Sequence, residues 1–443
     1  MMKKFNKDKY LKKLRFKKYK RYLYIGIPCM LVLLIGIYFA YSKFSVFKEE
    51  EVVRTTVGEF IHGDVVIGAY IDGEYSNTIP SKNDGYIVEK IVCDNNASAS
   101  WNNDSWGIVL TNLTKRTKCN IYFETKKSSL NETVTTAMSN NPSMFATDDP
   151  GKNVRYIGAN PSNYVYFNCS DYNNQSDSTC EKWRIIGVFN NVTKSDGTKE
   201  NLVKIIRDES IGNYSWDNKN TSTGAETVYG KNDWTIARLN YLLNPGHDSE
   251  SVGGSLYYNA KSGTCYSGQN NATTSCDFTS TGLKNDTTRN AIESVVWNLG
   301  GTNAYNTSTA SMFYTAERGT AVYSGRPTTW TGKIGLMYPS DYGYATGGSS
   351  SASRATCLVK ELFNWNSASD CYNNDYLFNN DYQWTLAPYS GAATHVFRVN
   401  SVGSVYDNIT YNTNGVRPTL YLKSNISVKS GDGTSNSSYQ LNL

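Results

Sequence analysis

The chain has 443 residues and a formal net charge of +5. The positive charge comes from eleven Lys and Arg residues within residues 1–21, where Asp8 is the only acid. The rest of the chain is therefore net negative, which argues against a basic surface that binds nucleic acid. We expect no nucleic-acid partner.

An apolar segment follows the basic residues. Residues 22–41 carry no charge, and about 20 apolar residues are enough to span the hydrocarbon core of a bilayer. Basic residues ahead of such a segment predict a cytoplasmic N-terminus and an exported remainder. We predict a cytoplasmic tail over residues 1–21 and a transmembrane signal anchor over residues 22–41, which makes this a single-pass protein of the cell membrane. A cleaved signal peptide is the alternative.

A stalk and a small domain are expected next. Residues 42–64 form the predicted stalk, and residues 65–124 form a predicted small all-β domain. Its first β-rich run ends at Asp72-Gly73, a typical hairpin signal. About 60 residues are marginal for an independent core. We interpret this domain as a spacer, with a sugar- or wall-binding module as the alternative.

The remaining residues are divided into a polar linker over residues 125–150 and a main domain over residues 151–443. Two helices are expected in the main domain, Trp234–Leu243 and Thr287–Asn298, because their apolar residues recur at helical spacing. Strands are expected at 183–189, 202–206, 334–337, 385–386, 396–399, 404–406 and 416–422. The predicted fold class is α+β, with two helices and mostly antiparallel strands.

The cysteines indicate export. An even number of them follows the apolar segment, which is typical of disulfides in exported chains. Sequential pairing is the simplest arrangement, although eight cysteines allow 105 connectivities. Zinc is disfavoured because there is no Cys-x-x-Cys and the chain has only three histidines, so we expect no metal and no cofactor. The eight are Cys93, Cys119, Cys169, Cys180, Cys265, Cys276, Cys357 and Cys371.

The C-terminal window over residues 389–414 has an unusual composition. Its 26 residues include no Lys, Glu, Gln, Met or Trp, and Tyr, Ser, Thr, Asn, Gly, Ala and Val dominate it. Every residue type present can arise from an AAC codon whose two adenines are replaced at random. A surface rich in Tyr, Ser, Gly and Asn is also typical of evolved binding faces. An ordinary surface hairpin, turning at Asn400-Ser401-Val402-Gly403, is the alternative interpretation.

The frame of this window resembles the C-terminal core of C-type-lectin-fold proteins of the formylglycine-generating-enzyme-like branch. There, a Trp-containing strand leads into a variable hairpin, and a Gly-Phe/Val-Arg strand closes the domain. Here Trp384-Thr-Leu-Ala-Pro precedes the window, and Gly415-Val-Arg-Pro follows it. The chain looks most like the variable receptor proteins of diversity-generating retroelements in gut Firmicutes, which are Gram-positive. In those proteins, adenine-directed copying rewrites the segment before the closing motif.

The resemblance covers about residues 150–443 and implies a C-type-lectin-like domain. Two features depart from its relatives. No cysteine lies in or near the closing motif to serve as the redox or copper-binding pair of the enzymes. The Glu-Pro-Asn and Gln-Pro-Asp triplets of calcium-dependent lectins are also absent, so calcium-mediated sugar binding is not expected.

Codon randomisation and the window's position predict a ligand-binding face, with Trp384 and Arg417 as scaffold residues on either side. Of its members, Tyr406, Tyr411 and Arg398 are expected to contribute most to binding. The predicted ligand-binding residues are Tyr389, Gly391, Ala392, Ala393, Thr394, His395, Arg398, Val402, Ser404, Tyr406, Asp407, Ile409, Thr410 and Tyr411.

The predicted function is that of a cell-surface receptor- or adhesin-like protein that binds an extracellular protein or glycan. The alternative is an exported carbohydrate-binding protein or an accessory of a cell-wall or glycan hydrolase. We expect no enzyme activity and assign no catalytic residue, because His62, His247 and His395 lack a partner pattern for acid–base chemistry. An exported hydrolase with an unrecognised pair of carboxylates is the enzymatic alternative.

Overall fold

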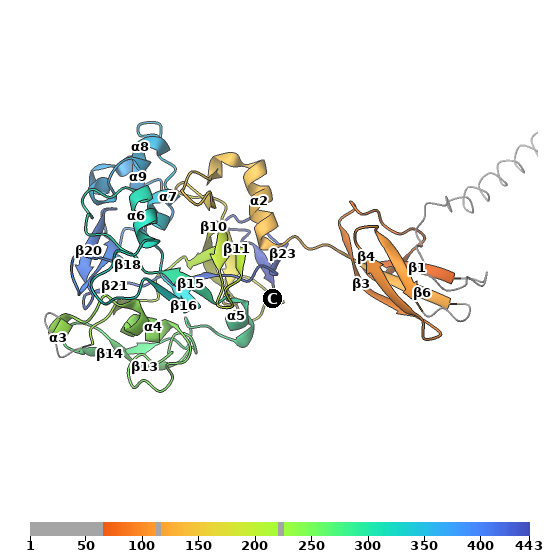
Figure 1. Cartoon of the computed structure of the whole chain (residues 1–443), viewed down its shortest axis with the longest axis horizontal. Helices are drawn as coiled ribbons and strands as arrows, with labels where there is room; N and C mark the ends of the chain where they lie inside the picture. Colours follow the sequence, from red (N-terminus) through yellow and green to blue (C-terminus); the bar gives the residue numbers. More distant parts are fainter. Residues whose placement is uncertain (1–64, 112–116, 220–225) are drawn as a thin grey trace, which may run out of the picture. The chain divides into compact units, whose positions relative to one another are not determined.

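The computed structural model describes residues 65–111, 117–219 and 226–443. The chain divides into two compact units, Met1–Lys126 and Lys127–Leu443 (Figure 1). The predicted tail, anchor and stalk over residues 1–64 lie outside the described residues.

The first unit is a small β structure. Its main sheet has the strand order β2-β1-β6-β3, and β1 runs parallel to β6. The predicted turn at Asp72-Gly73 joins β1 to β2, and both residues have positive φ angles, of 49° and 89°. The strands are β1 (Val65–Ile71), β2 (Glu74–Ser76), β3 (Tyr86–Cys93), β4 (Ser98–Asn102), β5 (Gly107–Thr111) and β6 (Thr117–Thr125).

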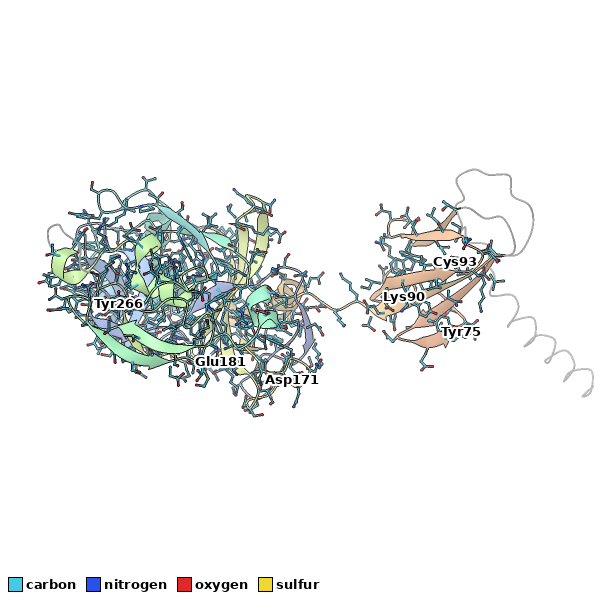
Figure 2. All side chains as sticks on the ribbon, turned by 90° about the horizontal axis from the view of Figure 1, so that it is seen from below. Tyr75, Lys90, Cys93, Asp171, Glu181 and Tyr266 are labelled. Atoms are coloured by element: carbon cyan, nitrogen blue, oxygen red, sulfur yellow. A yellow bond between two sulfur atoms is a disulfide. The ribbon has the colours of Figure 1, made fainter. Side chains whose placement is uncertain are left out.

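A compact apolar core stabilises this unit. Ile108, Ile121 and Phe123 are each no more than 1% exposed. Tyr75 and Lys90, by contrast, lie on the surface of β2 and β3, as Figure 2 shows.

Two larger sheets form the centre of the second unit. The first has the order β17-β22-β11-β10-β8-β7, with β9 paired to β10, and the second has the order β12-β21-β18-β19-β20. The first sheet contains β7 (Phe145–Ala146), β8 (Val154–Tyr156), β9 (Tyr164–Phe167), β10 (Glu181–Thr193), β11 (Lys199–Arg207), β17 (Ile334–Gly335) and β22 (Thr419–Tyr421). The second contains β12 (Asn213–Ser215), β18 (Gln383–Pro388), β19 (His395–Val399), β20 (Val405–Ile409) and β21 (Thr413–Gly415).

Three short antiparallel pairs and a series of short helices surround these sheets (Figure 1). The pairs are β13 (Ser262–Tyr266) with β14 (Thr273–Asp277), β15 (Val295–Asn298) with β16 (Thr329–Gly332), and β23 (Ser427–Ser430) with β24 (Gln440–Asn442). The helices are α2 (Leu130–Asn140), η1 (Pro142–Met144), α3 (Glu226–Tyr229), η2 (Trp234–Ile236), α4 (Arg238–Leu243), α5 (Asp286–Ala291), α6 (Ala310–Glu317), α7 (Pro339–Ala345), α8 (Arg354–Leu358), η3 (Leu362–Ser367) and α9 (Ser369–Tyr372).

The predicted α+β class with two helices is wrong, because the described residues are rich in strands and the second unit contains many more helical segments. Most of these helices have only one or two turns, too few to show an apolar period. Several of them begin at side-chain caps, as α6 does at Thr309 and α8 at Ser353.

Two segments differ from the expected elements for local reasons. The expected helix Thr287–Asn298 ends as α5 at Ala291, and the β-branched residues after it form β15, which pairs with β16. Helix α2 lies in the segment that was expected to be a polar linker. Its signal was present in the sequence, because Ser129 and Glu132 form a capping box.

The predicted membrane anchor is also corrected. No helix within the described ranges is long and apolar enough to cross a membrane. The anchor over residues 22–41, inferred from hydropathy alone, lies outside those ranges. The membrane partner and the single-pass location in the cell membrane depended on it, and we withdraw both.

A buried charge network lies in the core of the second unit. Lys204 Nζ lies 2.5 Å from Asp341 Oδ2, and Arg155 joins Asp341 to Asp149. All four side chains are no more than 1% exposed. Burial alone would raise the pKa of Asp341, but the charges of Lys204 and Arg155 lower it to about 2.

Candidate functional site

The C-terminal window forms the outer hairpin of the five-stranded sheet. Strand β20 pairs with β19 and is the last strand in the sheet order (Figure 1). The hairpin turns at the predicted position, where Asn400 N–H donates to the Ser404 carbonyl at 2.9 Å. Gly403 in this turn has a φ of 83°, a conformation that favours glycine.

The two framing residues are buried. Trp384 is 1% exposed, and its indole N–H donates to the Tyr214 carbonyl at 2.9 Å. Arg417 is 3% exposed, and its Nη1 donates to Gln383 Oε1 at 3.0 Å. Both side chains contact oxygen atoms of the protein interior, as a scaffold role requires.

Asn232 fixes the loop between β18 and β19. Its backbone N–H donates to the Ala393 carbonyl at 2.9 Å. Its side-chain Nδ2 lies within hydrogen-bond distance of the carbonyls of Tyr389 (3.0 Å), Ala392 (2.8 Å) and His395 (3.1 Å). All four acceptors are backbone atoms, so this arrangement does not depend on which side chains the loop carries.

Arg326 supports the same loop from behind Asn232. Its Nε donates to Asn232 Oδ1 at 3.1 Å, and its Nη2 donates to the Ala393 carbonyl at 3.3 Å. Nη2 is also paired with Glu226, whose other carboxylate oxygen lies 3.4 Å from Lys231 Nζ. This ion-pair group is partly buried and holds the loop through the Ala393 carbonyl, which also accepts from Asn232 N–H.

A third backbone support comes from the segment before α6. Ser390 N–H donates to the Thr302 carbonyl at 3.1 Å. A Cβ atom at Gly301 would lie 1.9 Å from the Pro388 carbonyl oxygen, so glycine permits the close approach. The loop therefore rests on neighbouring backbone as well as on Asn232.

An aromatic cluster lies beside the hairpin, formed by Tyr305, Phe363, Tyr389 and Tyr406, and we call it the Tyr305 cluster. Tyr305 contacts all three others, with ring centroids 5.4 Å from Phe363, 5.9 Å from Tyr389 and 5.3 Å from Tyr406. Tyr406 is 39% exposed, and the other three rings are partly buried. Amphipathic rings held in place by each other offer contact area at a low cost in side-chain entropy.

A titratable pair borders this cluster. His395 Nε2 lies 4.0 Å from Asp407 Oδ2, and the His395 ring lies 6.4 Å from the Tyr389 ring. Burial lowers the pKa of His395 and raises the pKa of Asp407, while their mutual attraction opposes both shifts. Because the pKa of His395 is lowered, its imidazole is uncharged at neutral pH, next to the aromatic rings.

Two further predicted residues have aromatic partners outside the cluster. Arg398 lies over the Tyr382 ring, 4.2 Å from its centroid, and its Nη1 donates to Asn414 Oδ1 at 2.8 Å. Tyr411 stacks on Tyr229 with ring centroids 5.3 Å apart. The expected strong contributors Arg398 and Tyr411 are thus held in place by aromatic residues that precede the window and, for Arg398, by Asn414 at its end.

The predicted residues do not all share one face of the hairpin. Arg398 is paired in register with Tyr406, and Phe397 with Asp407, so successive side chains point to alternate faces. Three predicted residues are buried, namely Thr394, Ser404 and Thr410. The remaining eleven are at least partly exposed, and they are Tyr389, Gly391, Ala392, Ala393, His395, Arg398, Val402, Tyr406, Asp407, Ile409 and Tyr411.

The buried three have structural contacts. Thr410 Oγ1 donates to the Tyr229 carbonyl at 2.7 Å, and Ser404 Oγ accepts from Asn366 N–H at 3.1 Å. Thr394 is 3% exposed, and its carbonyl accepts from Thr410 N–H at 2.8 Å. We therefore remove these three from the candidate binding face.

Sequence reasoning missed the residues that complete the site from other segments. Tyr305, Phe363, Asn232 and Arg326 are more than 25 residues away from the window in the chain and lie in polar segments without a periodic signal. The only local hint was the placement of Asn232-Asp233 before the helix expected at Trp234–Leu243. In the structure, the Asp233 side chain caps η2, whereas the Asn232 side chain donates to backbone carbonyls of the loop between β18 and β19.

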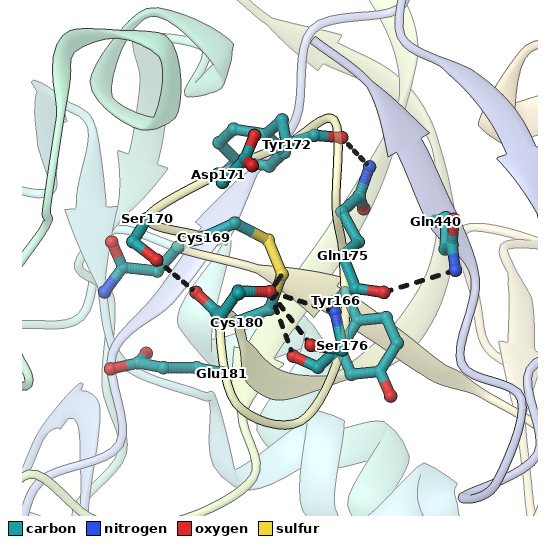
Figure 3. Close-up of a disulfide and its surroundings, with 12 residues drawn as sticks. Tyr166, Cys169, Ser170, Asp171, Tyr172, Gln175, Ser176, Cys180, Glu181 and Gln440 are labelled. Atoms are coloured by element: carbon teal, nitrogen blue, oxygen red, sulfur yellow. Dashed lines mark hydrogen bonds between the residues drawn. A yellow bond between two sulfur atoms is a disulfide. The ribbon is translucent and has the colours of Figure 1, made fainter.

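Four disulfides join the cysteines in sequential order: Cys93–Cys119, Cys169–Cys180, Cys265–Cys276 and Cys357–Cys371. They agree with a protein of an oxidising compartment. Figure 3 shows the loop closed by Cys169–Cys180, in which Gln175 Nε2 donates to the Tyr172 carbonyl at 2.8 Å. Gln440 Nε2 donates in turn to the Gln175 carbonyl at 3.3 Å, so this loop is attached to strand β24.

Within the described ranges, no group of three or more His, Cys, Asp or Glu side chains is arranged to hold a metal ion. The candidate site therefore consists of the Tyr305 cluster, the backbone hydrogen bonds that hold the loop between β18 and β19, and the His395–Asp407 pair.

Comparison with known proteins gives no relative: the chain matches no protein-family profile, no curated protein and no solved structure.

Proposed function

We propose that this protein is an exported receptor- or adhesin-like protein that binds an external protein or glycan through the Tyr305 cluster and the adjoining hairpin. The observation that carries the proposal is the partly exposed group of four rings around Tyr305. Tyrosines are enriched among the residues that dominate binding interfaces. The four disulfides support export.

We further propose that the exposed side chains of the window vary among related chains. The supports from Asn232, Arg326 and Thr302 reach the loop through backbone atoms. A scaffold of this kind tolerates side-chain replacement in the loop, because backbone carbonyls are the same for every residue. The resemblance to retroelement variable proteins motivates this part of the proposal, and a neighbouring reverse-transcriptase gene with an adenine-rich repeat would support it.

A displayed library tests the proposal directly. The eleven partly exposed window positions are randomised in the full chain with the disulfides formed, and folding is scored by resistance to protease. We expect a large share of the library to stay folded. Asn232→Ala in the parent sequence is the matched control and should lose protease resistance.

Selection then tests binding. The folded part of the library is selected against hen egg-white lysozyme, an arbitrary probe. We expect binders whose new contacts lie at window positions and whose affinity falls when Tyr305 is replaced by Ala. A library that mostly fails to fold, or binders that are indifferent to Tyr305, would contradict the proposed binding face.

A further inference from the structure

A second candidate site lies in a pocket of about 430 Å³ in the main unit. None of its lining residues belongs to the window or to the Tyr305 cluster. Two of them, Arg184 at 4% and Arg417 at 3% exposure, are buried cations. Buried charges are costly unless they are paired, so two guanidinium groups in one pocket wall require an explanation.

Arg184 is held rigidly. Its Nε donates to Asn163 Oδ1 at 2.6 Å. Its guanidinium carbon lies 3.8 Å from the centroid of the Tyr164 ring and 5.0 Å from that of Tyr376. Its nearest carboxylate is Asp208, with Oδ1 3.6 Å from Nη1, which is longer than a direct charge-assisted hydrogen bond.

The hydrogen-bond acceptors of Arg417 are all neutral. Its Nε donates to the Arg207 carbonyl at 2.9 Å, and its Nη1 donates to the Leu377 carbonyl and to Gln383 Oε1, both at 3.0 Å. Its Nη2 has no hydrogen-bond acceptor among the described residues. Burial and the neighbouring charge of Arg184 lower the pKa of Arg417, and the charges of Asp208 and Glu209 oppose this shift. The resulting pKa of about 10 keeps the group protonated at neutral pH.

The charges of the pocket are arranged by depth. The buried wall carries the two guanidiniums and the half-buried Asp208, whereas the acids Glu209 and Asp381 are exposed. Exposed carboxylates are screened by water and neutralise a buried cation only weakly. The buried wall therefore favours a ligand with one negative charge, and the exposed acids at the rim disfavour a ligand with several negative charges.

The remaining lining residues favour a hydroxylated ligand. Asn160 and Asn379 offer side-chain amides, and Phe378 offers an apolar surface. The planar fork of a guanidinium matches a carboxylate in two parallel hydrogen bonds.

We propose that this pocket binds a small hydroxylated carboxylate of the uronic acid class, with its carboxylate against Arg184 and Arg417 and its hydroxyl groups toward the rim. This site is separate from the proposed binding face. It would give the protein a second specificity, for acidic sugar units.

Calorimetry with the full disulfide-bonded chain tests this proposal. The probes are glucuronate, glucose and inorganic phosphate. We expect glucuronate to bind at least about tenfold more tightly than glucose, which lacks the charge-assisted pair with the guanidiniums. It should also bind more tightly than phosphate, whose second negative charge the acidic rim disfavours. Equal binding of glucuronate and phosphate would overturn the proposal in favour of a general anion site, and no binding of glucuronate would overturn it outright.

Two variants separate the pocket from other sites. Arg184→Gln should weaken glucuronate binding at least about tenfold, whereas Arg289→Gln, which lies outside the pocket, should leave it unchanged. Since Arg184 is buried and its variant could fail to fold, Glu209→Gln provides an independent measurement at an exposed position. Removing this rim acid should tighten glucuronate binding a few-fold, and unchanged or weaker binding would contradict the proposed orientation.

Discussion

The ring of Tyr406 lies edge-on to the ring of Tyr305, with their centroids 5.3 Å apart. This contact joins a residue of the window to a loop about one hundred residues earlier in the chain. Tyr305 in turn contacts Tyr389 at the other end of β19. A single ring outside the window thus links the loop and the hairpin into one surface.

The backbone supports predict a sharp difference in stability between two variants. Asn232→Ala removes the donor to three carbonyls and leaves buried polar atoms unsatisfied, which should cost about 2–4 kcal/mol of unfolding free energy. Tyr406→Ala, at a 39% exposed position, should cost less than about 1 kcal/mol. Chemical denaturation of both variants checks this, and equal losses would show that the window residue is structural.

Stability should fall as the pH rises from about 4.5 to 7. Burial raises the pKa of Glu317 to about 7, from its ordinary value of 4.5. The folded state therefore holds this proton where the unfolded chain has lost it, so the stabilisation is complete below pH 4.5 and disappears as the pH passes 7. The contribution is on the order of 3 kcal/mol.

Two measurements check the origin of this pH dependence. Glu317→Gln keeps the neutral form and should flatten the profile between pH 4.5 and 7. Asp341 acts in the opposite sense, because its pKa is lowered to about 2, so its stabilisation disappears only as the pH falls from about 4 to 2. A wild-type profile that rises between pH 4.5 and 7 would show that Glu317 is not the dominant group.

The four disulfides predict the thiol chemistry of the oxidised protein. No cysteine among the eight should react with iodoacetamide before reduction, and all eight should react afterwards. Peptide mapping should recover Cys169–Cys180 and Cys265–Cys276, whose separations are both 11 residues. Closing loops of this size contributes roughly 3 kcal/mol each in the chain-entropy model. Four or more alkylated cysteines without reduction would contradict both the pairing and the oxidising compartment.

Local sequence signals predicted the hairpins and the pairing of neighbouring cysteines. The turn at Asp72-Gly73 and the turn before Ser404 lie where the residue types require them. The Tyr305 cluster could not be predicted in this way, because its members come from three polar segments far apart in the chain. The helix expected over Thr287–Asn298 was wrong beyond Ala291. Its apolar residues fit a helical spacing, but those after α5 belong to β15, which pairs with β16.

The last prediction concerns related chains with the same scaffold. If the window is a variable binding face, differences among them should concentrate at the eleven partly exposed positions, including Tyr389, Arg398 and Tyr406. Asn232 and Arg326 should be constant, because their contacts hold the backbone of the loop. Buried Thr394, Ser404 and Thr410 should vary little, although an AAC-type codon could encode each of them.

Sequencing such relatives gives the measurement, and the buried residues supply its internal control. Codon-directed variation without selection for folding would change Thr410 as often as Tyr411. Selection for the scaffold would spare Thr410, whose hydroxyl donates to the Tyr229 carbonyl. It would still allow changes at Tyr411, a partly buried ring that stacks on Tyr229. Differences spread evenly over the chain, or concentrated outside residues 389–414, would exclude a variable face at this hairpin.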